Sequence, residues 1–214
     1  MKKSTFGVCL VLAVLLCLAP TALASEPTFP DMAQHWGSEY ADKAAALGLF
    51  IGGEDGNFHP DEEITRADFL TALWRGMGSP EPESESSFSD VPADAYYAKA
   101  AAWACGKGYV SGTERGLFLP FEVIERQAAM KILFYCVGEG SGTEMILFGV
   151  YDNGFADSGE IAPWAKDAMY WAYYGGVISG TDDGRLAPTG GTTRAQAAKM
   201  LVRCFEKNLQ EAAK

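Results

Sequence analysis

Three arginines occupy matching places along this 214-residue chain, and their setting predicts binding of anions. Arg66, Arg126 and Arg194 each fall in the first turn of a predicted helix. A helix N-terminus carries partial positive charge and free N–H groups, so a cation is disfavoured there. An arginine fork beside such N–H groups is a good receptor for a carboxylate or a phosphate. The chemistry indicated by these positions is therefore the capture of an acidic group.

A structural role for the same arginines is the alternative. Each arginine could form a salt bridge with an acid that opens its own segment or the next one. Those acids are Asp31, Asp90 and Asp157. Both roles hold together if the Asp positions the Arg.

Aromatic residues and glycines stand at constant distances before the arginines. An aromatic residue lies 30 residues upstream of each one, at Trp36, Tyr96 and Trp164. These rings could stack on a sugar face, or they could anchor a helix in the core, which their helical spacing favours. A glycine lies 14 residues upstream of each arginine, at Gly52, Gly112 and Gly180. These glycines either let a ligand approach the backbone closely or serve turn geometry alone.

The constant spacings identify three copies of one helical module. Each copy opens with Phe-x-Asp, at 29–31, 88–90 and 155–157, and an amphipathic helix follows. In the first copy Trp36, Tyr40, Ala44 and Leu47 form its apolar stripe. A glycine then stops the helix, at Gly48, Gly108 and Gly176.

A second helix is predicted to begin at Thr65, Glu125 and Thr193, after a turn rich in Gly and Asp. Thr193 and Gln196 fit a capping box, and Thr65 with Asp68 approximates one. Each of these second helices carries an apolar face. The sequence therefore predicts a mainly α protein in which three such helices form a central, pseudo-threefold bundle.

An export signal is predicted at the start of the chain. Lys2 and Lys3 precede an apolar run at 8–18, and Ala22 and Ala24 suit a cleavage site after residue 24. An uncleaved N-terminal anchor helix is the alternative, although the run is short for a membrane span. The predicted organisation is signal peptide 1–24, repeat 26–78, linker 79–87, repeat 88–138, linker 139–154, repeat 155–206 and tail 207–214. No membrane span is expected after cleavage.

Composition restricts the classes of partner. Lys and Arg number 17 against 28 Asp and Glu, a net charge of −11 that becomes −13 without Lys2 and Lys3. A chain this acidic does not bind nucleic acid through its general field, and it repels anionic polymers at long range. Local, convergent cations must hold any anion that it binds.

Catalytic and metal chemistry have little support. His35 and His59 are the only histidines, and no Cys-x-x-Cys spacing suggests zinc. The turn at 54–57 lacks the alternating oxygen ligands of a calcium loop. Three cysteines follow the predicted signal, Cys105, Cys136 and Cys204. An odd number cannot all pair in disulfides, so we interpret them as small buried residues. We expect no enzyme, no cofactor and no metal, although composition alone does not exclude a glycosidase carboxylate pair.

Taken together, the motifs resemble the S-layer homology (SLH) family. The matching features are Phe-x-Asp, the Trp of the first helix, Gly-x-x-x-Gly at 48–52, Phe-x-Pro, and Thr-Arg-Ala-Asp or Thr-Arg-Ala-Gln at 65–68 and 193–196. The resemblance implies a pseudotrimeric, three-pronged spindle. It also implies a secreted protein at the cell wall or cell surface that binds secondary cell-wall polymers, often pyruvylated, attached to peptidoglycan. Ligand grooves would lie between neighbouring prongs, with the Arg, the Trp and the Gly-rich segment contributing. The alternative is a structural surface-layer protein that contacts other surface proteins without glycan binding.

The second copy departs from the pattern, reading Glu125-Arg126-Gln127-Ala128. It loses the capping Thr and places an acid beside the arginine. Because Glu125 would repel an anionic ligand, we expect the second groove to be the weakest. Arg66→Ala and Arg194→Ala should then weaken binding to wall polymer more than Arg126→Ala.

Overall fold

A computed structural model describes residues 28–138, 155–181 and 183–212. The predicted signal peptide and the linker at 139–154 lie outside these ranges. Within them the chain forms six α-helices and isolated β-bridges but no named strand, which confirms the mainly α class. No helix in the described ranges combines the length and the apolar character that a membrane crossing needs.

Each repeat contributes two of the α-helices. The first helices are α1 (Ser38–Ala46), α3 (Ala98–Gly106) and α5 (Lys166–Tyr174). The second helices are α2 (Arg66–Gly76), α4 (Arg126–Leu133) and α6 (Arg194–Ala212). A π-helical segment, η2 (Phe134–Gly138), continues α4, and short 3₁₀ turns occur at η1 (Pro30–Met32), η4 (Ser158–Glu160) and η5 (Pro163–Ala165).

The predicted starts of the second helices and the predicted ends of the first helices are confirmed. Thr65 caps α2 by accepting a hydrogen bond from the Asp68 N–H at 3.1 Å. Thr193 and Gln196 form the reciprocal capping box, at 3.3 and 3.2 Å, whereas Glu125 gives α4 no side-chain cap. The first helices stop before Gly48, Gly108 and Gly176, whose φ angles are +69°, +75° and +73°. Glycine adopts this left-handed conformation without steric cost, which is why it stands at the end of each helix.

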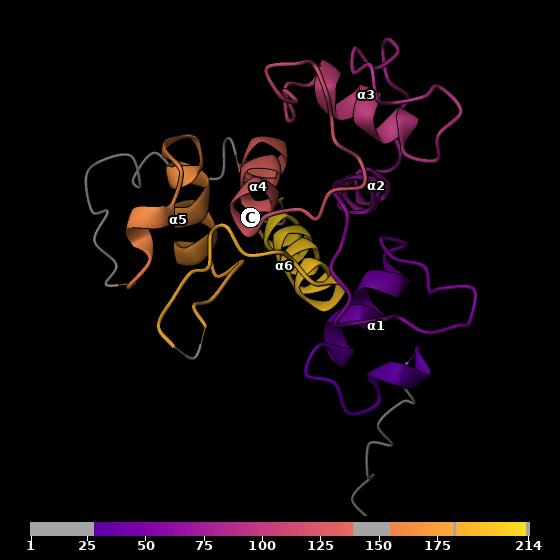
Figure 1. Cartoon of the computed structure of the whole chain (residues 1–214). Helices are drawn as coiled ribbons and strands as arrows, with labels where there is room; N and C mark the ends of the chain where they lie inside the picture. The colour runs from indigo at the N-terminus through magenta and orange to yellow at the C-terminus, as the bar shows by residue number, and fades with distance from the viewer. Residues whose placement is uncertain (1–27, 139–154, 182, 213–214) are drawn as a thin grey trace, which may run out of the picture.

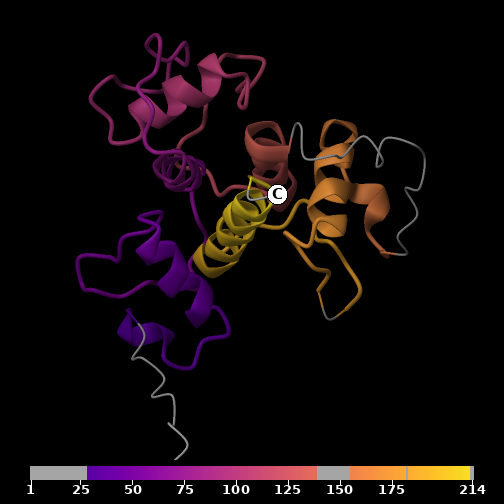
Figure 2. The same ribbon diagram turned by 180° about the vertical axis from the view of Figure 1, so that it is seen from behind.

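Each first helix packs against the second helix of a different repeat. α3 packs on α2, α5 packs on α4, and α1 packs on α6. Each first helix therefore lies against the second helix of the preceding repeat, and the first repeat closes on the third. Both views show α1, α3 and α5 in three separate lobes around the second helices (Figures 1 and 2).

A ring of three backbone hydrogen bonds closes this arrangement just before the second helices. The Ile64 N–H donates to Thr192 O at 2.8 Å, Thr192 donates to Ile124 O at 3.1 Å, and Ile124 donates to Ile64 O at 3.1 Å. All three side chains are buried. The ring supports the predicted pseudo-threefold relation. Close packing among the second helices is established between α2 and α6, and the three-pronged spindle with a central three-helix bundle stays a prediction.

The predicted apolar stripe of the first helix is wrong at both ends. Trp36 lies before α1 and is 56% exposed, and Leu47 is 46% exposed. Ala44 is buried as predicted, together with Ala41, and these small side chains let α1 lie close against its neighbour. The periodicity extended the helix through Gly37, which in fact occupies the N-cap position.

Cys105, Cys136 and Cys204 form no disulfide among the described residues, as predicted. Cys204 is buried, and Cys105 and Cys136 are partly buried against the core. Burial raises the pKa of the Cys136 thiol to about 12. These residues therefore behave as packing groups.

Candidate functional site

Three pseudo-equivalent grooves lie between the repeats, and each one draws residues from all three copies. Groove A, of about 620 Å³, combines Arg66, the loop at 109–114, the α4 face with Lys131, and Trp164. Groove B, of about 410 Å³, combines Arg126, the loop at 177–181, the α6 face with Lys199, and Trp36. Groove C, of about 170 Å³, combines Arg194, the loop at 49–51, the α2 face with Thr71, and Tyr96. The structure thus places each predicted arginine with an aromatic residue from a different repeat.

Each arginine reaches into the neighbouring repeat. The Arg66 Nε donates to Phe118 O at 2.9 Å, and its guanidinium lies 5.2 Å from the centre of that ring. Arg194 repeats both contacts with Phe58, at 2.8 and 5.2 Å. Burial lowers the pKa of both guanidinium groups. The backbone bond and the ring therefore fix the direction in which each arginine points.

Arg126 is held differently, because the third repeat has Leu186 where the other two have phenylalanine. Its Nη2 donates to Ser179 O at 3.0 Å, which ties it to the loop of groove B. Its Nε is buried and has no hydrogen-bond partner among the described residues. Burial lowers the pKa of this guanidinium also. Arg126 is thus the least restrained of the three arginines.

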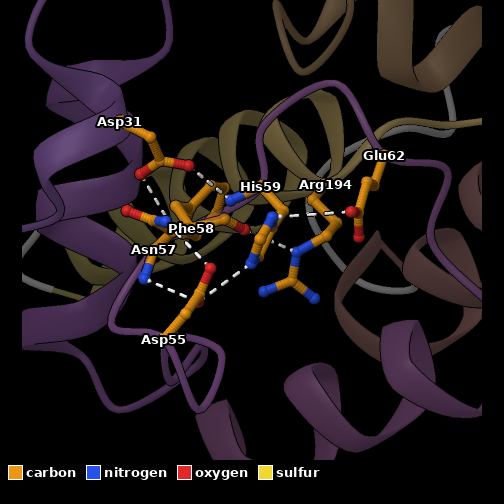
Figure 3. A network of polar contacts seen from close by, with 7 residues as sticks. All are labelled: Asp31, Asp55, Asn57, Phe58, His59, Glu62 and Arg194. Carbon is orange, nitrogen blue, oxygen red and sulfur yellow. Dashed lines mark hydrogen bonds and ion pairs between the residues drawn. The ribbon is translucent and has the colours of Figure 1, made fainter.

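The opening acids act on the arginines indirectly. Asp31 accepts hydrogen bonds from the Phe58 and His59 N–H groups at 2.9 and 2.7 Å (Figure 3), and Phe58 O in turn accepts from Arg194. Asp90 and Asp157 make the same pair of contacts in their own repeats. The residues clamped this way include His59, Leu119 and Ala187, whose φ angles of +57°, +60° and +50° are unusual without glycine. The predicted Arg–Asp salt bridge is absent from the described residues, and the Asp positions the Arg through the backbone between them.

The expectation of free N–H groups beside the arginines is wrong for the first turn. The Arg66 N–H donates to Glu122 O, the Arg126 N–H to Gly190 O and the Arg194 N–H to Glu62 O, each at 2.9 Å. The next N–H along each helix donates to Pro120 O, Pro188 O or Pro60 O. These neighbouring carbonyls compensate the helix ends, so an incoming anion must rely on side chains.

The aromatic residues are exposed, so the core-anchor alternative is wrong. Trp36, Tyr96 and Trp164 are 56%, 59% and 49% exposed. Lys199 Nζ lies 5.6 Å from the Trp36 ring centre and Lys131 Nζ lies 5.1 Å from that of Trp164. Trp36 and Trp164 each present an open face beside a cation, an arrangement suited to a sugar that carries an acidic group.

Sequence reasoning missed the two lysines. Lys131 and Lys199 occupy the same register, five residues after the arginine of α4 and of α6, where the first repeat has Thr71. The fixed register was the signal that could have found them. The fold is needed to show that each lysine lies next to the tryptophan of a different repeat.

The glycines have a packing role that neither prediction included. A Cβ at Gly52 would lie 2.9 Å from the Phe29 ring, and one at Gly112 would lie 2.5 Å from Phe88. Gly180 meets the corresponding ring of Phe155. Gly112 and Gly180 also line grooves A and B, so a thin loop there serves both the core and the groove.

Charge distinguishes the grooves. Groove A mixes Arg66 and Lys131 with Glu114, Glu122 and Glu125. Among the described residues that line groove B, no carboxylate accompanies Arg126 and Lys199. Burial, together with the positive charges of Arg203 and Arg126, lowers the pKa of Lys199. Groove B is therefore a concentration of positive charge in a strongly acidic protein.

In groove C, the aromatic residue is hydrogen-bonded to a carboxylate of the protein. The Tyr96 hydroxyl donates to Asp68 Oδ1 at 2.6 Å, and Asp68 shares the lining with Arg194. Burial and this carboxylate raise the pKa of Tyr96. An acid of the protein thus takes the place that an external anion would need.

Glu125 was expected to repel an anion from the groove of Arg126, but it lies elsewhere. Glu125 lines the groove of Arg66, although it precedes Arg126 in sequence. The Gln127 side chain donates to Glu125 at 2.8 Å and accepts from the Ala162 N–H at 3.0 Å, which fixes the acid there. Adjacent residues at the start of α4 therefore serve two different grooves.

Comparison with known proteins agrees with this threefold arrangement. The model of the S-layer homology domain matches residues 28–70, 87–130 and 154–198. The Surface-layer 125 kDa protein of Lysinibacillus sphaericus is 30% identical over 90% of this chain and 16% of its own length. The S-layer protein sap of Bacillus anthracis is 28% identical over the whole chain and 25% of its own length. An amylopullulanase of Thermoanaerobacterium thermosulfurigenes is 26% identical over 87% of the chain and 10% of its own length. The chain thus spans a quarter or less of these relatives, and it belongs to the S-layer homology domain family, with three copies of the domain.

Proposed function

We propose that this protein anchors to the bacterial cell wall by binding an anionic wall polysaccharide, with groove B as the principal site. Membership of the family makes it a cell-surface, cell-wall-associated protein. The observation that carries the proposal is the convergence of Arg126, Lys199 and the exposed face of Trp36 in one groove. No lining carboxylate among the described residues neutralises these cations.

The chemistry of groove B fits an acidic sugar. The Trp36 face offers a stacking surface, and Lys199 and Arg126 offer charge-assisted hydrogen bonds at its edge. A carboxylate such as a pyruvyl group, or a phosphate, would satisfy both cations. Because the whole chain is strongly acidic, attraction of an anion depends on local cations such as these and acts at short range.

The other grooves rank below groove B. Groove A has the same three kinds of residue but also three glutamates, which oppose an anion. Groove C lacks the lysine and holds Asp68 beside Arg194. The order that we propose for anion binding is B, then A, then C.

The proposed role is binding without catalysis. The named relatives include surface-layer proteins and an amylopullulanase, and the chain spans only 10% of that enzyme. The region that they share with this chain contains the family's domain, so we do not transfer the enzyme's activity. Within the ranges that the structure describes, no group of three His, Cys, Asp or Glu could hold a metal ion.

Sedimentation with protein-free cell walls tests the proposal. The protein should pellet with walls that retain their anionic polymer and stay in solution when the polymer has been extracted. Lys199→Ala should reduce the bound fraction strongly, whereas Thr71→Ala, at the matching place in groove C, should leave it unchanged. Trp36→Ala and Tyr96→Phe form a second matched pair with the same expectation.

The same experiment addresses the alternative of a surface-layer role through protein contacts. Pelleting that persists after polymer removal and is unaffected by Lys199→Ala would support contacts with other surface proteins or with copies of this chain. Sedimentation velocity across a concentration series would then separate those two kinds of contact.

A further inference from the structure

Next to groove B, cations and aromatic rings alternate along the contact between α6 and α1. Arg203 lies one helical turn after Lys199 on α6. Its guanidinium lies 5.6 Å from the centre of the Tyr40 ring of α1, and Lys199 Nζ lies 6.0 Å from the same ring. Trp36, Lys199, Tyr40 and Arg203 thus form a continuous row in which aromatic rings alternate with cations.

The same loop of the third repeat connects Arg203 to Arg126. The Arg203 Nη1 donates to Gly176 O at 2.7 Å, and the Arg126 Nη2 donates to Ser179 O at 3.0 Å. Three residues of extended backbone span at most about 10 Å. The two guanidinium groups therefore attach to points of one loop that are no more than about 10 Å apart, and the charges of both act on Lys199.

Acids lie near this row but do not pair with its cations: Asp157 acts on Arg126 without an ion pair, and Glu206 of α6 forms its ion pair with Lys43 of α1. Arg126, Lys199 and Arg203 form no ion pair with any carboxylate among the described residues, although acids outnumber bases in the chain. Instead, the positive charges of Arg203 and Arg126 act on Lys199. Such mutual repulsion destabilises the protein alone and is relieved when anions bind.

Among the three grooves of the described structure, only groove B has all parts of this row, with the two rings from the first repeat and Lys199 and Arg203 from the third. The residue at the register of Arg203 is Arg75 in α2 and Tyr135 after α4. Arg75 follows Thr71, so groove C has no lysine in the row, and Tyr135 leaves groove A with no second arginine.

We propose that Arg203 and Tyr40 form a second anion subsite, which makes groove B selective for a glycan chain that carries at least two acidic groups. This inference rests on the proposed function of groove B and adds the spacing and number of charges that it recognises. A monomer with one carboxylate would occupy the position at Arg126 and Lys199 alone. A chain with two would gain the Arg203 contact without losing further translational freedom.

Oligogalacturonates of one, two and three residues are suitable probes, because each residue carries one carboxylate. Calorimetric titration at fixed ionic strength should give an affinity about tenfold higher for the two-residue probe than for the monomer. Arg203→Gln should abolish this increase, so that the variant binds the monomer and the two-residue probe with equal affinity. Glutamine keeps most of the aliphatic stem of the side chain and removes the charge. Arg203→Lys should retain the increase.

Arg75→Gln, at the same register of α2, is the matched control and should behave as the wild type. Equal affinity of the wild type for the probes, absence of binding by all of them, or an increase that survives Arg203→Gln would overturn the second subsite. The proposed function fails by a different result, which is wall sedimentation that Lys199→Ala does not reduce. The two hypotheses are therefore tested separately.

Discussion

Thr192 provides a sharp test of the packing at the centre of the molecule. Its side chain is fully buried in the ring of backbone hydrogen bonds, and its Oγ1 has no partner among the described residues. The equivalent positions in the other repeats are Ile64 and Ile124. Replacing Thr192 by valine keeps the shape of the side chain and removes the hydroxyl that has no partner.

The expected gain follows from the cost of burying a polar group. A buried hydroxyl without a hydrogen bond costs about 1–3 kcal/mol relative to an apolar group of the same shape. Thr192→Val should therefore raise the free energy of unfolding by about 1–2 kcal/mol. For a domain of this size that corresponds to an increase in Tm of about 2–8 °C. Urea and thermal denaturation followed by circular dichroism at one protein concentration would measure both quantities.

A matched substitution should have the opposite sign. Thr71 is also buried, but its Oγ1 donates to Ala67 O at 2.7 Å. Thr71→Val removes a satisfied hydrogen bond and should destabilise the protein by about 0.5–1.5 kcal/mol. If Thr192→Val destabilised the protein as much as Thr71→Val, the Thr192 hydroxyl would have a partner and the reasoning would be refuted.

Three further predictions concern the scaffold of the grooves. Asp90→Ala removes two hydrogen bonds from backbone N–H groups, so it should lower the free energy of unfolding by about 3 kcal/mol in urea denaturation. A loss below about 1 kcal/mol would contradict the role of Asp90 in holding this backbone. Gly112→Ala should lower Tm, because the added Cβ would lie 2.5 Å from the Phe88 ring and the residue has a φ of +67°. Gly106→Ala is the control and should not lower Tm, because no atom lies within 4 Å of its added Cβ. The raised pKa of Cys136, about 12, leaves roughly one thiol in 10⁴ ionised at pH 8, so iodoacetamide should label it slowly in the native protein and rapidly in urea, as peptide mass mapping would show.

The helices and their repetition could be predicted because local signals recur at fixed spacing. Thr65, Thr193 and the stop glycines act on their own helices, so one copy is enough to interpret them. A second copy without its cap was predictable for the same reason.

The grooves could not be predicted, because each one joins three repeats that are distant in sequence. Glu125 and Arg126 are neighbours in the chain but line different grooves, so adjacency assigned the acid to the wrong groove. Trp36 follows the helical period but lies before the helix and is exposed, since Gly37 takes the N-cap position. Periodicity locates a residue on a helix only when the end of that helix is known.

The packing of α1 on α6 has a consequence for how many copies such a protein can contain. In an open stack of repeats, each unit touches only its neighbours, and a copy can be added at either end. Here the first and third copies are neighbours too, and Ile64 donates its hydrogen bond to Thr192. Deleting the third repeat would leave α1 without its partner, and inserting a fourth would separate residues that must meet. The copy number is thus fixed by closure, and the three repeats gain or lose stability as one unit.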